Sequence, residues 1–129
     1  MNQGSRDLIE YKLERSRETL EEAEIMLQSS HLFGAANRIY YACFYAVSAL
    51  LLSEDLSSPK HSGVISLFNR HFVKTGLISV ELGKFYSRLF DTRLESDYAD
   101  LVTVELEEIQ DNIKTAEVFI SSVKSLIKE

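Results

Sequence analysis

The last quarter of the chain carries an apolar pattern that an α-helix buries on one face. From residue 102 to residue 127, apolar side chains recur at alternating steps of four and three without a miss: Val102, Leu106, Ile109, Ile113, Ala116, Ile120, Val123 and Ile127. At 3.6 residues per turn, these steps place all of them on one side of the helix. The spacing predicts a long amphipathic helix that packs against other helices at shallow crossing angles.

The remainder of the chain is also predicted to be helical, because 129 residues include one proline and five glycines. Residues 6–28 repeat the four-and-three spacing, with Ser16 at the one step where an apolar residue is missing. Residues 32–54 are apolar on nearly every side, which is typical of a helix in the middle of a bundle. Two further helices are expected at residues 59–74 and 79–96.

Local signals indicate where these helices begin and end. Ser5 or Asp7 is expected to cap the first helix with its side-chain oxygen, and Pro59 fits the first turn of the third. Gly76 is expected in the left-handed conformation just beyond the third helix. With short connections and no period-two pattern, the sequence predicts an all-α up-and-down helical bundle of four long helices plus one shorter helix, a single domain over residues 1–129.

Composition and charge restrict the classes of function. The net charge of -6 and pI near 5.1 argue against a broad basic surface for nucleic acid, although a few arginines in a cleft would still hold a phosphate. The lone Cys43 forms no internal disulfide or zinc cage, and no Glu-x-x-His spacing occurs, so we expect no metal and no cofactor. Residues 1–10 lack a signal-peptide pattern and the apolar stretch 39–52 is short for a membrane span, so we expect a cytoplasmic location without membrane contact.

Polar residues on the apolar second helix mark a candidate site. Arg38, Tyr41 and Tyr45 follow steps of three and four, so they form one polar stripe. An unpaired buried arginine would cost several kcal/mol, so Arg38 needs a partner. The partner is either an internal acid, with both tyrosine hydroxyls at the rim, or an anion bound in a cleft.

Two other stretches leave similar alternatives open. Arg93 and Asp97 stand four apart and form either a surface ion pair or, with Asp97 reaching Arg38, a contact across the bundle. Lys60 and His61 open the third helix, where free backbone N–H groups attract anions, so the segment is either a phosphate site or an ordinary helix start.

Three motifs in this order resemble the HEPN family of small uncharacterised prokaryotic proteins: Asn37–Ala42 (NRIYYA), Lys60–Gly63 (KHSG) and Arg93–Tyr98 (RLESDY). The resemblance spans nearly the whole chain and implies a helical bundle that commonly forms a homodimer. It also implies a minimal nucleotidyltransferase as a toxin–antitoxin partner, and metal-independent RNase activity in several members. Their catalytic pair is an arginine followed four to six residues later by a histidine, and no histidine follows Arg93 at that distance.

Two functions remain open from the sequence. The first is a nucleotide- or RNA-binding HEPN protein, the toxin or RNase-like partner of a nucleotidyltransferase. Its candidate catalytic residues are His61, Arg93 and Asp97, and its candidate nucleotide- or phosphate-binding residues are Arg38, Tyr41, Tyr45, Lys60 and Tyr98. The second is a non-catalytic interaction module that dimerises or docks on a partner protein, in which the same polar residues only fix helix register.

Overall fold

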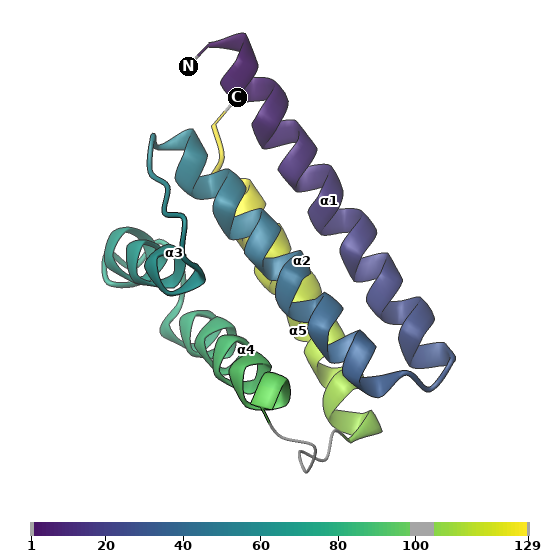
Figure 1. The fold of residues 1–129 in the computed structure, drawn as a ribbon. Coiled ribbons are helices and arrows are strands. Elements are labelled where there is room, and N and C mark those ends of the chain that lie inside the picture. The colour runs from purple at the N-terminus through teal and green to yellow at the C-terminus, as the bar shows by residue number, and fades with distance from the viewer. Residues whose placement is uncertain (1, 99–104, 129) are drawn as a thin grey trace.

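The structure is a computed structural model that describes residues 2–98 and 105–128, without the side chains of residues 93–98. The described residues form helices and no strand (Figure 1). The helices are α1 (Gln3–Gln28), α2 (Leu32–Ser53), α3 (His61–Phe68) with one π-helical turn (Asn69–Val73), α4 (Val80–Tyr98) and α5 (Leu106–Ser125). The predicted all-α fold of four long helices and one shorter helix is confirmed.

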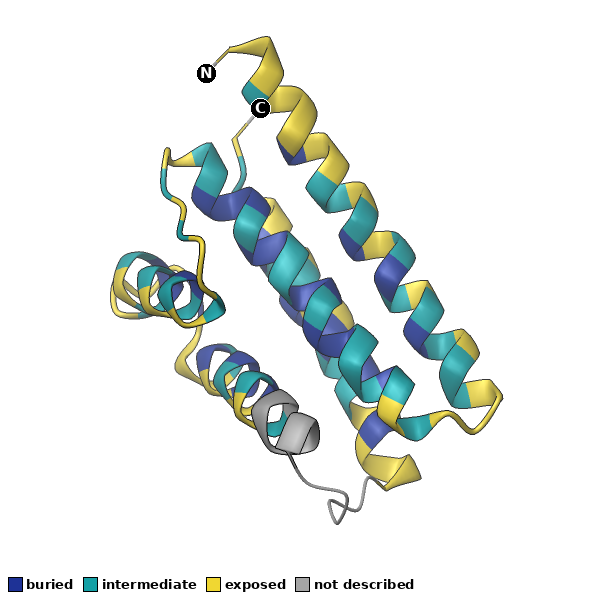
Figure 2. Cartoon of the chain, viewed as in Figure 1, coloured by how far each residue is buried: buried dark blue, intermediate teal, exposed yellow. Residues whose placement is uncertain are grey.

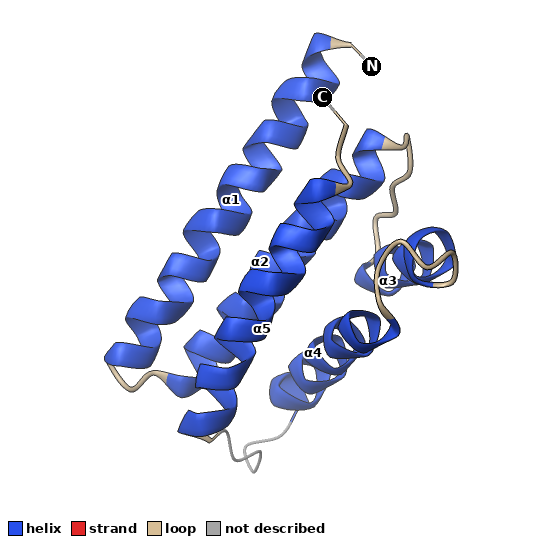
Figure 3. Cartoon of the chain, turned by 180° about the vertical axis from the view of Figure 1, so that it is seen from behind, coloured by secondary structure: helices blue, strands red, loops and turns tan. Residues whose placement is uncertain are grey.

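Helix α2 occupies the centre of the bundle. It contacts α1, α3, α4 and α5, and its small residues Ala35, Ala42 and Ala46 are fully buried. Helices α1 and α5 run alongside α2, whereas α3 and α4 lie on its other side and α3 is viewed nearly end-on in Figures 1 and 3. The nearly continuous apolar surface of α2 is therefore explained by neighbours on several sides, as predicted.

Ser16, the polar residue on the apolar face of α1, has a specific hydrogen-bond partner. Ser16 is buried, and its hydroxyl donates a hydrogen bond of 2.7 Å to the backbone carbonyl of Ala42 in α2. A buried hydroxyl needs such an acceptor, because an unsatisfied polar group costs about 1–3 kcal/mol. Ser16, which interrupts the apolar spacing of α1, therefore forms a specific contact between α1 and α2.

Aromatic side chains join α5 to the pair formed by α3 and α4. The fully buried Phe119 lies 5.7 Å from Phe68, 6.1 Å from Phe85 and 5.5 Å from Tyr86, measured between ring centroids. Figure 2 shows buried residues on the inward side of each of these helices. Phe119 therefore gives α5 a second buried face beside the predicted seam.

The predicted seam itself is only partly correct. Ile109, Ile113, Ala116 and Val123 are buried, whereas Ile120 and Ile127 are half-buried. Leu106 is 50% exposed because it lies in the first turn of α5, at the end of the described bundle. The first seam residue, Val102, lies outside the described residues.

Two of the predicted helix ends are wrong and one is confirmed. Helix α1 begins earlier than predicted, so its cap is Asn2, whose side chain accepts the N–H of Ser5 at 2.8 Å. Pro59 precedes the extended residue Lys60 and lies before α3 instead of in its first turn. Gly76 has φ of +82°, the left-handed conformation predicted for it.

Among the described helices, α2 alone has the length and apolar composition of a membrane span. Of its most apolar window, 56% is buried inside the bundle, which is the pattern of a core helix. The predicted apolar stretch at residues 39–52 is the C-terminal part of this longer helix.

Candidate functional site

The imidazole of His61 is held at the junction of α2 and α3. Its Nδ1 lies 2.7 Å from the hydroxyl oxygen of Tyr40, at hydrogen-bond distance. Its ring stacks on Phe44 with centroids 4.3 Å apart and planes 9° from parallel, and the Tyr41 ring stands edge-on at 5.8 Å. Because His61 is only half-buried, this group of side chains, which we call the His61 cluster, holds the ring in one orientation while part of it reaches solvent.

The loop before α3 explains why the helix begins at His61. Ser58 accepts the backbone N–H of Lys60 at 3.3 Å, and its side chain occupies the space that a Cβ at position 63 would need. Gly63 therefore lets the Ser58 turn close against the first turn of α3. Lys60 caps this turn with extended backbone and an exposed side chain, which places a positive charge beside His61.

Behind the His61 cluster lies a buried tyrosine that sequence patterns did not single out. Tyr86 is fully buried, and its ring is stacked against Tyr40 with centroids 6.1 Å apart. Burial raises the pKa of Tyr86 well above its usual value, and the neighbouring Tyr40 raises it further. The Tyr86 hydroxyl makes no well-formed hydrogen bond with the residues that the structure describes. It therefore stays protonated beside Tyr40.

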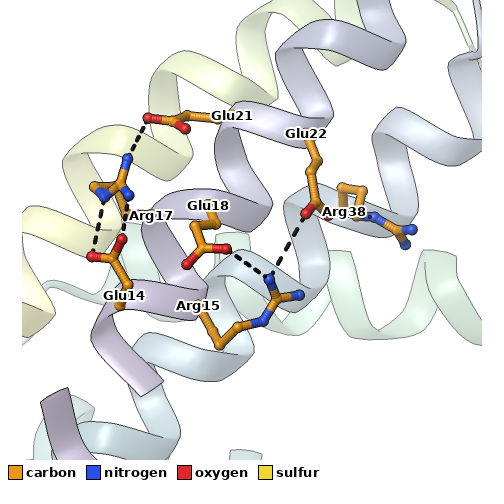
Figure 4. Close-up of polar contacts among 7 residues, drawn as sticks. All are labelled: Glu14, Arg15, Arg17, Glu18, Glu21, Glu22 and Arg38. Atoms are coloured by element: carbon orange, nitrogen blue, oxygen red, sulfur yellow. Dashed lines mark hydrogen bonds and ion pairs between the residues drawn. The ribbon is translucent and has the colours of Figure 1, made fainter. Parts of the chain in front are cut away.

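Arg38 lies in a separate group of charges that spans α1 and α2 (Figure 4). Its Nε is 3.0 Å from Glu22 Oε1 and its Nη1 donates to Asn37 Oδ1 at 2.8 Å. Arg15 also approaches Glu22, at 3.8 Å, and Glu18, at 3.2 Å. The Arg38 side chain is 37% exposed, so the ion pair is at the bundle surface and not in its interior.

The two tyrosines of the predicted stripe take different positions. Tyr41 lies edge-on to Tyr40, with ring centroids 5.1 Å apart, and so belongs to the His61 cluster. Tyr45 lies under the guanidinium of Arg15, which is 5.6 Å from the centre of its ring. The stripe predicted from spacing is therefore divided between the His61 cluster and the charges around Arg38.

The other candidates are on α4. Arg93, Asp97 and Tyr98 belong to its last turns, and their side chains lie outside the described part of the chain. Within the described residues, no three His, Cys, Asp or Glu side chains are grouped to hold a metal ion. Cys43 is fully buried, and burial raises the pKa of its thiol, so it is not an activated nucleophile.

Sequence reasoning found His61 and Tyr41 but gave no site role to Tyr40 or Phe44. Phe44 was seen only as a member of an apolar helix and Tyr40 also as part of the NRIYYA motif, since nothing in their spacing distinguishes them from other core residues. The available signal was the Tyr40-Tyr41 pair in an apolar stretch, because a buried tyrosine usually needs a hydrogen-bond partner.

Comparison with known proteins agrees with the fold and the motifs. The family model for the HEPN domain matches residues 9–126. The chain is 51% identical over 122 residues to a UPF0332 protein of Thermotoga maritima, covering 95% of this chain and 92% of that protein. It is 33% identical over 129 residues to "Putative toxin MJ0605" of Methanocaldococcus jannaschii, covering 100% and 96%, and 31% identical over 119 residues to "Putative toxin MJ0142" of the same organism, covering 92% and 81%. The match over most of its length shows that this chain belongs to the HEPN family.

Proposed function

We propose that this chain is a cytoplasmic HEPN protein that binds the phosphates of RNA or nucleotides as the toxin component of a two-protein system. Two relatives carry the word toxin in their names, which supports the biological setting. The proposed partners are a second copy of the chain in a homodimer and a nucleotidyltransferase. The proposed site is the His61 cluster together with Lys60, Arg93, Asp97 and Tyr98 from neighbouring segments.

The orientation of His61 is the observation that carries this proposal. A hydrogen bond to Tyr40 and stacking on Phe44 fix a half-buried imidazole at the first residue of α3. Backbone N–H groups and the helix dipole favour an anion at such a position, and Lys60 adds a cation beside it. A surface histidine at an ordinary helix start would not need two aromatic neighbours to hold it.

The overall charge of the chain sets the expected mode of binding. A protein of net charge -6 does not attract nucleic acid through a broad surface field, so affinity must come from a few local contacts. If Lys60 and Arg93 each neutralise one phosphate, log K for single-stranded RNA should fall with log[salt] with a slope of about -1.4. A basic surface would give a much steeper slope.

The proposed activity is binding, and cleavage is a separate question. Metal-independent RNA cleavage needs one group to take the 2'-hydroxyl proton and another to stabilise the phosphorane. The sequence lacks the histidine that should follow Arg93, and Asp97 is a poor base for this step. RNA integrity should therefore be monitored in every binding experiment.

The test is fluorescence anisotropy of labelled single-stranded RNA with the purified full chain at several salt concentrations. The variants His61→Ala and Lys60→Ala should each weaken binding about tenfold, since a hydrogen bond to a charged group contributes about 1.5–3 kcal/mol. His31→Ala is the matched control, because His31 is an exposed residue before α2. The proposal would be refuted if all three variants bound RNA with the affinity of the wild type, or if the wild type did not bind RNA.

A second candidate function is a non-catalytic interaction module, and the Arg38–Glu22 ion pair favours it. With Glu22 as its partner, Arg38 already has a counter-charge at the bundle surface and helps to fix α1 against α2. Light scattering after size-exclusion chromatography, with and without a minimal nucleotidyltransferase, measures the homodimer and the complex. Stable assembly by a wild type that binds no RNA would select this second function.

A further inference from the structure

The glycine at position 63 is not required by the backbone conformation of α3. Gly63 is the third residue of this helix, and among the described glycines only Gly76 has a left-handed φ. At an ordinary helical position alanine forms helix better than glycine, because glycine loses more backbone entropy. A glycine in the first turn of α3 therefore needs a different reason, and the loop before the helix supplies one.

The reason is the space that Ser58 occupies. The Cβ of Ser58 would lie 2.8 Å from a Cβ at position 63, and the Ser58 Oγ would lie closer still. Cβ contacts shorter than 3.0 Å are essentially absent from protein structures, so an alanine at position 63 must displace Ser58. Rotation of the Ser58 side chain would leave its Cβ in place, and it would break the hydrogen bond that Oγ accepts from the N–H of Lys60 at 3.3 Å.

The segment from Ser58 to Lys60 is stiff enough to pass such a displacement on. Pro59 has a fixed φ and restricts the residue before it to extended conformations. Lys60 is itself extended, and its carbonyl accepts the N–H of the buried Val64 at 3.0 Å. Both backbone groups of Lys60 are therefore held, the N–H by Ser58 and the carbonyl by α3. A shift of Ser58 moves one end of Lys60 while the other end stays fixed.

We infer that Ser58 and Gly63 are positioning residues that set where the Lys60 ammonium lies beside His61. The inference rests on the proposed function, in which Lys60 contacts a phosphate, and deepens it by assigning the need for glycine at position 63 to the phosphate site. A lysine side chain has several rotatable bonds, so the fold can fix its origin but not its tip. Fixing the origin lowers the entropy that phosphate binding costs.

The first experiment uses the free, full chain and needs no RNA. In ¹H–¹⁵N spectra of the ¹⁵N-labelled protein, Gly63→Ala should shift the backbone amide of Lys60, which reports its hydrogen bond to Ser58. The same substitution in a Ser58→Gly background should leave this amide nearly unchanged, because the displaced side chain is gone. Gly4→Ala is the matched control in the first turn of α1, since a Cβ there meets only Asn2 Oδ1, at an ordinary 3.5 Å.

The second experiment measures binding of labelled single-stranded RNA by fluorescence anisotropy. Gly63→Ala should weaken binding about fivefold, which is less than the tenfold loss expected when the Lys60 side chain is removed. In a background that already carries Ser58→Gly or Lys60→Ala, it should change affinity by less than about twofold, because residues that act through one another are not additive. Circular dichroism confirms that each variant is folded. If Gly63→Ala alone fails to fold, the double variant with Ser58→Gly should fold, and unfolding of both overturns the inference.

The outcomes separate this inference from the proposed function. An unchanged Lys60 amide in Gly63→Ala overturns the steric contact with Ser58. An equal loss of RNA binding with and without Ser58→Gly overturns the role of Ser58, and an equal loss with and without Lys60→Ala overturns action through Lys60. If the free protein shows the Ser58-dependent shift of the Lys60 amide but the wild type binds no RNA, the positioning of Lys60 stands and the proposed function fails.

Discussion

Replacing Phe119 by alanine tests whether one aromatic side chain joins the two parts of the bundle. Phe119 is fully buried on α5 and lies against Phe68 of α3 and against Phe85 and Tyr86 of α4. Removing a buried phenylalanine ring costs the transfer free energy of the ring and leaves a cavity among stiff aromatic neighbours, for a total of about 3–5 kcal/mol. Because single domains are stable by only about 5–15 kcal/mol, this is a large fraction of the total.

The expected loss in the free energy of unfolding can be converted into shifts of the thermal and urea unfolding midpoints. With an unfolding entropy of about 2.1 cal/mol/K per residue, a loss of 3–5 kcal/mol in 129 residues lowers Tm by about 11–18 °C. With a urea m-value of about 2 kcal/mol/M, the same loss lowers the midpoint by about 2 M. Circular dichroism in urea and on heating measures both shifts.

The matched control for this experiment is the preceding residue. Val118 is 58% exposed on the outer face of α5, so Val118→Ala should change the free energy of unfolding by less than about 0.5 kcal/mol. If Phe119→Ala cost less than about 1 kcal/mol, the aromatic contacts around Phe119 would not hold α3 and α4 against α5, and the account of the core would be wrong.

Three further expectations follow from buried or crowded polar groups. Ser16→Ala removes the hydrogen bond to the Ala42 carbonyl and should cost about 1 kcal/mol in urea unfolding; no change would mean that this bond does not stabilise the contact between helices. Cys43, whose pKa is raised by burial, should resist thiol reagents at pH 8 until the chain is unfolded, and rapid reaction of the native protein would contradict its burial. Burial and then the nearby Glu117 raise the pKa of Glu24, so the folded state binds this proton more readily than the unfolded state and stability falls as pH rises through that pKa. Glu24→Gln should therefore stabilise the chain at pH 7 by about 0.3 kcal/mol, because solvent screens the interaction, and should lose this advantage near pH 3, where Glu24 is protonated; an advantage that persists at pH 3 would exclude this cause.

The fold was predictable from periodicity because most helices bury a single face. The spacing in α1 and α5 identified buried residues such as Ala23 and Ile113, and the apolar composition of α2 identified the central helix. Phe119 was missed because α5 buries a second face against α3 and α4, and one seam cannot reveal a helix with two sets of neighbours. Leu106 was wrongly expected in the core, since a repeat in the sequence continues regardless of where the neighbouring helices end.

The candidate site was less predictable, because its contacts join residues that are far apart in the sequence. His61 was identified by its place in a motif, but its partner Tyr40 lies 21 residues earlier. Arg38 was correctly expected to need a counter-charge, and Glu22, the acid found beside it, is 16 residues earlier on another helix. Spacing within one helix shows which residues share a face, whereas the packing of two helices decides which residues meet.

The geometry of the proposed site depends on the core that Phe119 completes. Tyr40 is on α2 and His61 is on α3, so their 2.7 Å contact requires α3 to stay in place against α2. Helix α3 is only eight residues long, and its buried Phe68, seven residues after His61, packs against Phe119. A helix so short is not stable alone, so tertiary contacts such as this one must hold it. Loosening the core by Phe119→Ala should therefore also broaden the range of orientations that the His61 ring adopts.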